Sequence, residues 1–174
     1  MNENFKFDKE ELQLVVFRLG AEEYTVPIES VQEIIMPQSA THIPKSSDFI
    51  EGVINLRGKI IPVIDGRKRF DIKAYPASSE TRIIVLEVNE HFVGLLVDAV
   101  SEVAYLSSSE IESPPDEFNG STDFIQGVGK YNGRLLILLD INKFMTVNEI
   151  NSISSTIKKA ENIVNTVENI SALL

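Results

Sequence analysis

Two aspartates are the first candidates for catalytic chemistry, because they occupy equivalent positions in two similar stretches of the chain. Asp65 lies in Phe49–Phe70 and Asp140 in Phe124–Met145, and these segments align without a gap at an offset of 75 residues. Two carboxylates from a duplicated β unit could share a proton, as in an aspartic protease. That chemistry needs Asp-Thr/Ser-Gly in each half, whereas the contexts here are Asp-Gly-Arg and Asp-Ile-Asn. We therefore interpret each aspartate as the cap of a short helix after its strand.

Other residues with catalytic or metal-binding potential are sparse. The sequence has no cysteine and two histidines, His42 and His91, neither at ligand spacing from a second histidine or an acidic pair. It contains no phosphate-binding glycine loop and no Gly-x-Ser-x-Gly nucleophile motif. We expect both histidines to be ordinary surface residues. We also expect the protein to be no enzyme and to bind neither a cofactor nor a metal.

The composition is that of a globular protein with an acidic surface. Of the 174 residues, 43% are hydrophobic and 24% are charged, with a formal net charge of −10. Such a charge repels nucleic acid and anionic lipid unless a local basic patch overrides it. The one basic run, Arg67-Lys68-Arg69, is expected to be a solvated surface segment. Apolar runs are far shorter than the ~20 residues that span a bilayer. We expect a cytoplasmic protein that binds no nucleic acid and does not insert into a membrane.

The turn inside the first repeated segment is a second candidate site. The first copy reads Asn55-Leu56-Arg57-Gly58, where the second reads Lys130-Tyr131-Asn132-Gly133. Asn-Gly between apolar strands is a strong hairpin signal, so an ordinary turn needs no arginine. Arginine offers a planar fork of five donors, which suits protein interfaces. The residues alone leave two interpretations open, a solvated arginine at a loop tip or a partner-binding group.

Short β-strands must position these residues. Leu12–Leu19 and the stretch that starts at Tyr24 predict a strand and its return, and Leu12–Ile34 is repeated as Thr81–Val103 at an offset of 69 residues. Apolar spacings of three and four predict a short helix near Glu29–Glu33, and Asp98 could cap another over Ala99–Glu102.

Each repeat is therefore predicted to contain two strands, a short helix, a loop and two more strands. Many short strands with regular turns indicate small barrels or sandwiches, here two barrels related by a pseudo-two-fold axis. The second middle loop, Ser107–Asp123, is six residues longer than the first. Loops of this length are commonly functional or partly disordered.

The C-terminal part differs from the repeats. Thr146-Val-Asn-Glu149 fits a capping box, and apolar residues then recur at spacings of three and four. This predicts an amphipathic helix of roughly seven turns. It could be a coiled-coil or partner-binding helix. A helix lying on its own barrels is favoured, because about three and a half heptads are marginal for a coiled coil and asparagines weaken the helix.

Several motifs resemble those of one family. The run Ile50–Asp65 contains E-G-V-I-N-L-R-G followed by I-I-P-V-I-D. F-x-L-G-x-E-x-Y at Phe17–Tyr24, V-Q-E-I at Val31–Ile34 and V-G-L-L-V-D-x-V-x-E-V at Val93–Val103 occur in the same order. Together they closely resemble CheW-like domains, the chemotaxis coupling proteins, over roughly Leu12–Met145.

This resemblance implies a mainly β fold of two SH3-like five-stranded β-barrels with short helices. The barrels would be subdomains of residues 12–72 and 81–145, followed by a helix over residues 146–174. It also implies a non-enzymatic scaffold that couples the cytoplasmic tips of methyl-accepting chemoreceptors to the regulatory domain of the histidine kinase CheA. An adaptor of the same family that serves another receptor or kinase system is the alternative.

The resemblance also assigns partner-binding residues. The arginine of N-L-R-G corresponds to Arg57, and the acidic residue of V-x-E-I corresponds to Glu33; both are associated with partner contact. The apolar groove for the helical receptor tip would include Val31, Ile34 and Val100. The expected partner-binding set is completed by the other turn residues, Asn55, Leu56 and Gly58. Two departures stand out, Gly66 where the family usually has leucine and a C-terminal helix longer than the domain needs.

Overall fold

The computed structural model describes residues 10–73, 76–115 and 123–173. Its strands are β1 (Glu11–Leu19), β2 (Glu22–Pro27), β3 (Val31–Ile35), β4 (Ile50–Leu56), β5 (Lys59–Asp65), β6 (Arg82–Val88), β7 (His91–Val97), β8 (Ala99–Ser107), β9 (Ile111–Glu112), β10 (Ile125–Tyr131) and β11 (Arg134–Leu139). Its helices are α1 (Gly66–Arg69), α2 (Val147–Leu173) and the 3-10 turns Ile28–Ser30, Ser108–Glu110 and Ile141–Lys143. Residues 116–122 of the long loop predicted at Ser107–Asp123 lie outside the described residues.

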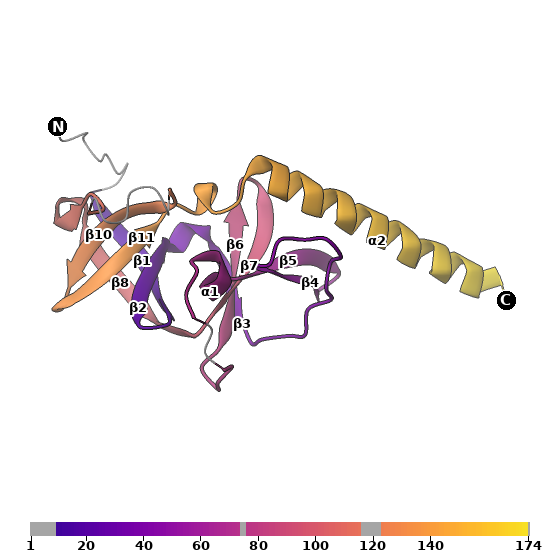
Figure 1. Ribbon diagram of the computed structural model, residues 1–174, viewed down its shortest axis with the longest axis horizontal. Helices are drawn as coiled ribbons and strands as arrows, with labels where there is room; N and C mark the ends of the chain where they lie inside the picture. Colours follow the sequence, from indigo (N-terminus) through magenta and orange to yellow (C-terminus); the bar gives the residue numbers. More distant parts are fainter. Residues whose placement is uncertain (1–9, 74–75, 116–122, 174) are drawn as a thin grey trace.

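The strands form two sheets that lie next to each other (Figure 1). One is six-stranded, in the order β8-β1-β2-β11-β10-β9, and the other is five-stranded, in the order β3-β6-β7-β5-β4. We call them the six-stranded barrel and the five-stranded barrel. The predicted fold class, mainly β with two SH3-like barrels, is confirmed.

Each barrel contains strands from both sequence repeats. The hairpin β1–β2 of the first repeat lies in the six-stranded barrel with β8 to β11, and the hairpin β6–β7 of the second lies in the five-stranded barrel. Two parallel ladders join the repeats, with Leu136 opposite Glu23 and Val63 opposite Gly94. The barrels therefore do not coincide with residues 12–72 and 81–145, because the first hairpin of each repeat completes the barrel of the other.

Both predicted helical segments are mainly strand, and the prediction for them is wrong. The segment near Glu29–Glu33 forms one 3-10 turn and then enters β3, while Ala99–Glu102 is the start of β8. The pairing of β3 with β6 shifts between Val31 and Glu33, and the pairing of β8 with β1 shifts in the same way. A β-bulge adds one residue to a strand. Apolar positions then recur three residues apart instead of two, which imitates helical spacing.

Three apolar clusters stabilise this arrangement. One consists of side chains of the six-stranded barrel, and a second of side chains of the five-stranded barrel. The third and largest draws on both barrels and includes the fully buried Phe17 and Phe144. The Phe70 ring contacts those of Tyr24 and Phe124 at centroid distances of 5.0 and 4.8 Å. Burial of this shared apolar surface holds the two barrels together.

The basic run after β5 is solvated only in part, contrary to the prediction: Lys68 is exposed, but Arg67 is buried and Arg69 half-buried. Arg67 is buried and donates to Asp65 Oδ1 (3.2 Å) and to Asp98 Oδ1 (3.3 Å). Asp98 caps no helix; its other oxygen accepts from the Gly20 backbone N–H at 2.7 Å. This buried ion cluster connects β5, the β7–β8 junction and the β1–β2 turn. A buried arginine between two carboxylates compensates charges that would otherwise be costly.

The helix-capping interpretation of the two aspartates is confirmed. Asp65 is the N-cap of α1, and its side chain accepts hydrogen bonds from the backbone N–H groups of Arg67 and Lys68. Asp140 caps the following 3-10 turn by accepting from Asn142 N at 3.0 Å. Both carboxylates therefore satisfy backbone donors that have no partner within the helix.

The C-terminal helix α2 begins as predicted. Glu149 N donates to Thr146 Oγ1 at 3.1 Å, and Thr146 N donates to Glu149 Oε1 at 3.4 Å, which completes the capping box. Ile153 is buried and Ile157 half-buried against the shared core, so the first half of α2 lies on the barrels. The second half projects past the five-stranded barrel (Figure 1). Among the described residues, no helix is long and apolar enough to cross a membrane.

Candidate partner-binding site

The turn between β4 and β5 has an unusual backbone for its sequence. Arg57 and Gly58 both have positive φ angles, 51° and 86°, and Gly58 N donates to Asn55 Oδ1 at 2.9 Å. Two consecutive left-handed residues define a type I′ turn, which normally carries Asn-Gly. A residue other than glycine, asparagine or aspartate is destabilised by about 1 kcal/mol in this region. Arg57 therefore adopts a left-handed backbone conformation that arginine disfavours.

Arg57 forms an ion pair with Glu33 of the edge strand β3. The Arg57 side chain is 73% exposed, whereas that of Glu33 is 24% exposed. An exposed ion pair contributes about 0–1 kcal/mol to stability. The pair therefore does little for the fold, but it orients a guanidinium group toward solvent and leaves most of its donors available to a partner.

The second repeat also has an ion pair at the corresponding glutamate, but with an arginine at a different position and with a different exposure. Glu102 corresponds to Glu33 in the repeat alignment, and it pairs with Arg134 rather than with a residue of the turn. Arg134 also contacts Glu23 at 3.1 Å and is only 37% exposed. Its hydrogen bond to Glu102 raises the pKa of Arg134, with Glu23 adding to the effect. This arginine is held by two carboxylates, so Arg57 is the more accessible of the two arginines.

A hollow of about 210 Å³ lies beside the Arg57–Glu33 pair. Its apolar lining includes Ile61, Val85 and Phe92 of the five-stranded barrel. Lys59 stands 4.8 Å from the centre of the Phe92 ring, a cation–π arrangement. The candidate site thus combines a charged, exposed tip with an adjacent apolar recess, the composition expected for a protein contact.

The three apolar residues predicted for the receptor groove lie in two different environments. Val31 and Val100 are half-buried, and both pack against the core shared by the barrels. Ile34 is not part of that core; it is 43% exposed on β3. The structure thus brings Val31 and Val100 to one cluster and leaves Ile34 on the outer surface of an edge strand.

Three exposed apolar residues on or next to the edge strands β3 and β8 were not among the predicted site residues. Met36 follows β3 and is 61% exposed, and Val103 and Tyr105 lie exposed on β8. Val103 and Tyr105 are the repeat equivalents of Ile34 and Met36 at the offset of 69 residues. The same alignment could therefore have found them. The two barrels present equivalent apolar pairs on their edge strands.

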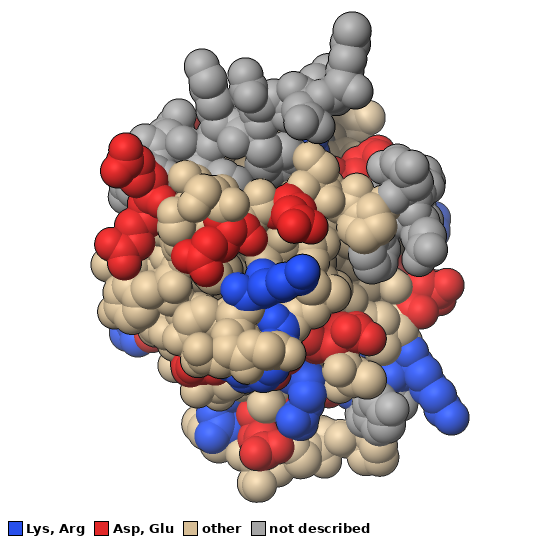
Figure 2. All heavy atoms as spheres, turned by 90° about the vertical axis from the view of Figure 1, so that its left-hand side faces the viewer, with Lys and Arg blue, Asp and Glu red and all other residues tan. Residues whose placement is uncertain are grey.

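Charged side chains do not form a basic patch on the described end of the molecule seen in Figure 2, where blue and red atoms are intermixed. Arg67 and Arg69, which the sequence grouped as basic, are both engaged internally; Arg69 donates to Phe144 O at 2.9 Å and lies over the Phe49 ring. Within the described residues, no group of three or more His, Cys, Asp or Glu side chains is arranged to hold a metal ion.

Comparisons with known proteins agree with this geometry. The family model described as CheW-like domain matches residues 13–149. The chain is 37% identical to the "Chemotaxis protein CheW" of Klebsiella aerogenes, covering 84% of this chain and 89% of that protein. It is 38% identical to the "Chemotaxis protein CheW" of Bacillus subtilis, covering 75% of this chain and 84% of that protein.

A solved structure gives the same result at the level of the fold. The "scaffolding protein TtCheW" of Thermoanaerobacter tengcongensis superposes with a TM-score of 0.74 at 41% sequence identity. The match covers 79% of this chain and 94% of that chain. With the family model spanning both barrels, the chain belongs to the CheW-like family of chemotaxis proteins.

Proposed function

We propose that this chain is a non-enzymatic cytoplasmic scaffold that couples methyl-accepting chemoreceptors to the regulatory domain of the histidine kinase CheA. The observation that carries the proposal is Arg57, an exposed arginine held at a left-handed turn position where asparagine would fit better. Backbone strain at an exposed site that adds little stability is typical of a functional residue. Family membership and the scaffolding relative support the same role.

Two surfaces would bind partners, one polar and one apolar. The Arg57–Glu33 pair, with Asn55, Leu56 and Gly58 around it, would supply oriented polar contacts. Val31 and Val100 would receive the helical tip of a receptor, since amphipathic helices dock through their apolar faces, and the exposed Ile34 of β3 would add a separate apolar contact. None of these roles requires a catalytic group or a cofactor.

A kinase-activation assay tests the role of Arg57. The purified chain is combined with CheA and a receptor cytoplasmic fragment, and Arg57→Glu is compared with Lys130→Glu. Lys130 is an exposed cation near the tip of the equivalent hairpin, so the charge change is matched. We expect Arg57→Glu to weaken complex assembly and kinase activation at an unchanged unfolding temperature, with Lys130→Glu close to wild type. Normal coupling by folded Arg57→Glu would remove Arg57 from the site.

The choice between chemotaxis and another receptor or kinase system is a question of partners. Co-precipitation from a cell lysate with the intact chain separates the two, because the captured kinase and receptor differ. Recovery of CheA together with methyl-accepting receptors supports the proposal, and recovery of a different histidine kinase supports the alternative adaptor.

A further inference from the structure

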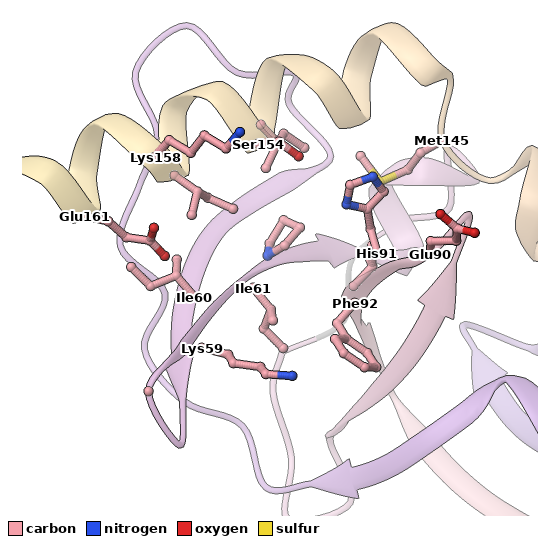
Figure 3. A pocket seen from close by; sticks show the side chains of 15 residues that line it. Lys59, Ile60, Ile61, Glu90, His91, Phe92, Met145, Ser154, Lys158 and Glu161 are labelled. Atoms are coloured by element: carbon pink, nitrogen blue, oxygen red, sulfur yellow. The ribbon is translucent and has the colours of Figure 1, made fainter.

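A cleft of about 450 Å³ is lined by the first half of α2 on one side and by the five-stranded barrel on the other (Figure 3). The barrel side is formed by Lys59–Pro62 of β5 and by the start of β7, including Phe92. The helix side is formed by Ile153, Ser154 and Ile157, with Lys158 and Glu161 farther along. This cleft is largely apolar at its base and charged along its rim, and it lies beside the seam where α2 contacts the barrel.

The open part of β5 in this cleft is poorly suited to an added strand. The parallel ladder with β7 covers only Val63–Asp65, so Lys59–Pro62 has no strand partner on that side. Pro62 has no N–H to donate, and a strand laid here would lack a ladder hydrogen bond. The cleft is better filled by side chains, as from an amphipathic helix.

The second half of α2 is an amphipathic helix without a partner in the described structure. Val167 and Ile170 are 57% and 54% exposed. Asparagines such as Asn162 and Asn169 have low helix propensity, and helices without tertiary contacts are marginal in water. The CheW-like family model ends at residue 149, so this segment lies outside the family domain. Its stability as a helix therefore calls for a contact that the barrels do not provide.

We propose that the second half of α2 docks into the cleft of a second copy of this chain, with the two α2 helices antiparallel. The exposed apolar residues Val167 and Ile170 and one wall of the cleft belong to the same helix. A single two-fold axis therefore places the second half of each α2 in the cleft of the other copy. A register centred near residue 162 places Val167 of each copy beside Ile157 of the other, and Ile170 beside Ser154. Residues 162–173 contain one charged residue, Glu168, so two copies with a net charge of −10 meet where charge is low.

Sedimentation of the full chain over a concentration series tests this contact. We expect a monomer–dimer equilibrium, accompanied by a helical circular dichroism signal that rises with concentration. Val167→Glu combined with Ile170→Glu should weaken the dimer at least tenfold, because it places charges against an apolar cleft. The matched control, Asn169→Glu with Ala172→Glu, adds the same charges at exposed positions on the opposite face of α2 and should leave dimerisation unchanged.

Cysteine cross-linking tests the register independently, since the chain has no native cysteine. A mixture of the Ser154→Cys and Ile170→Cys proteins should form a heterodimeric disulfide faster than either protein alone. Monomeric behaviour up to about 1 mM would overturn the proposal. Dimerisation that survives Val167→Glu with Ile170→Glu would also overturn it, because it would place the contact elsewhere.

Discussion

Arg57 and Asn132 occupy the same position of two equivalent hairpin turns, with φ angles of 51° and 50°. Both are followed by a glycine of positive φ, so the two turns share one backbone geometry. Asparagine tolerates this conformation well, whereas arginine does not. The second repeat thus has the residue that suits the turn, whereas the first has an arginine, for which we propose a role in partner binding.

Replacing Arg57 with asparagine separates stability from binding. Arg57→Asn gives the first turn the Asn-Gly sequence of the second, so we expect the free energy of unfolding to rise by about 0.5–1 kcal/mol. We expect receptor–kinase coupling to fall, because the guanidinium group is lost. Urea unfolding and the kinase-activation assay measure the two effects. A variant that is both stabilised and fully active would mean that the arginine has no role in coupling.

Exchanging the charges of Glu33 and Arg57 tests whether the ion pair itself is what a partner recognises. The double variant Glu33→Arg with Arg57→Glu can restore the pair in the reverse orientation. We expect unfolding to stay within about 0.5 kcal/mol of wild type, since exposed pairs contribute little. Coupling should remain impaired, because the donors now lie on β3 instead of the turn. Recovery of coupling relative to both single variants in a double-mutant cycle would instead assign the pair a structural role.

The duplication explains why much of this fold could be predicted from sequence. Regular turns such as Asn132-Gly133 and short apolar runs define strands locally, and the resemblance of the motifs supplied the barrels. What could not be predicted is the exchange of hairpins between repeats. It depends on the parallel ladders that pair Leu136 with Glu23 and Val63 with Gly94, which no local pattern encodes.

The secondary structure of the third strand of each repeat was predicted wrongly for a local reason. A bulge near Gln32 and another near Ser101 shift the alternation of buried residues, so the segments have helical spacing but strand structure. Arg57 and Glu33 were predicted separately as partner-binding residues; the structure joins them in an ion pair, and their role in binding stays a prediction. Arg67 was misjudged, since its carboxylate partner Asp98 is 31 residues away in the chain.

Removing Arg67 should destabilise the protein strongly. Arg67→Ala leaves Asp65 and Asp98, both buried, without their counter-charge. Breaking a buried ion cluster in this way costs on the order of 3 kcal/mol. The control is Lys68→Ala, which removes an exposed pair with Glu51 and should change the free energy of unfolding by less than about 0.5 kcal/mol. Equal urea midpoints for the two variants would contradict the buried cluster as a source of stability.

Two glycines of the first repeat should respond differently to alanine. Gly52 has a φ of 145°, and a Cβ there would lie 2.2 Å from the Thr41 carbonyl oxygen. That oxygen accepts a hydrogen bond from Val53 N, so it cannot move away without breaking a β-bridge. Gly58 also has positive φ, but a Cβ there meets nothing within 4 Å.

We therefore expect Gly58→Ala to cost about 1 kcal/mol of backbone strain, and Gly52→Ala to cost more because of the added steric overlap. Thermal and urea unfolding of both variants measure the difference directly. Because Gly58 lies beside Arg57, we also expect Gly58→Ala to reduce receptor–kinase coupling while the protein stays folded. Should Gly52→Ala prove as stable as Gly58→Ala, the close approach of the Thr41 backbone to β4 would be refuted.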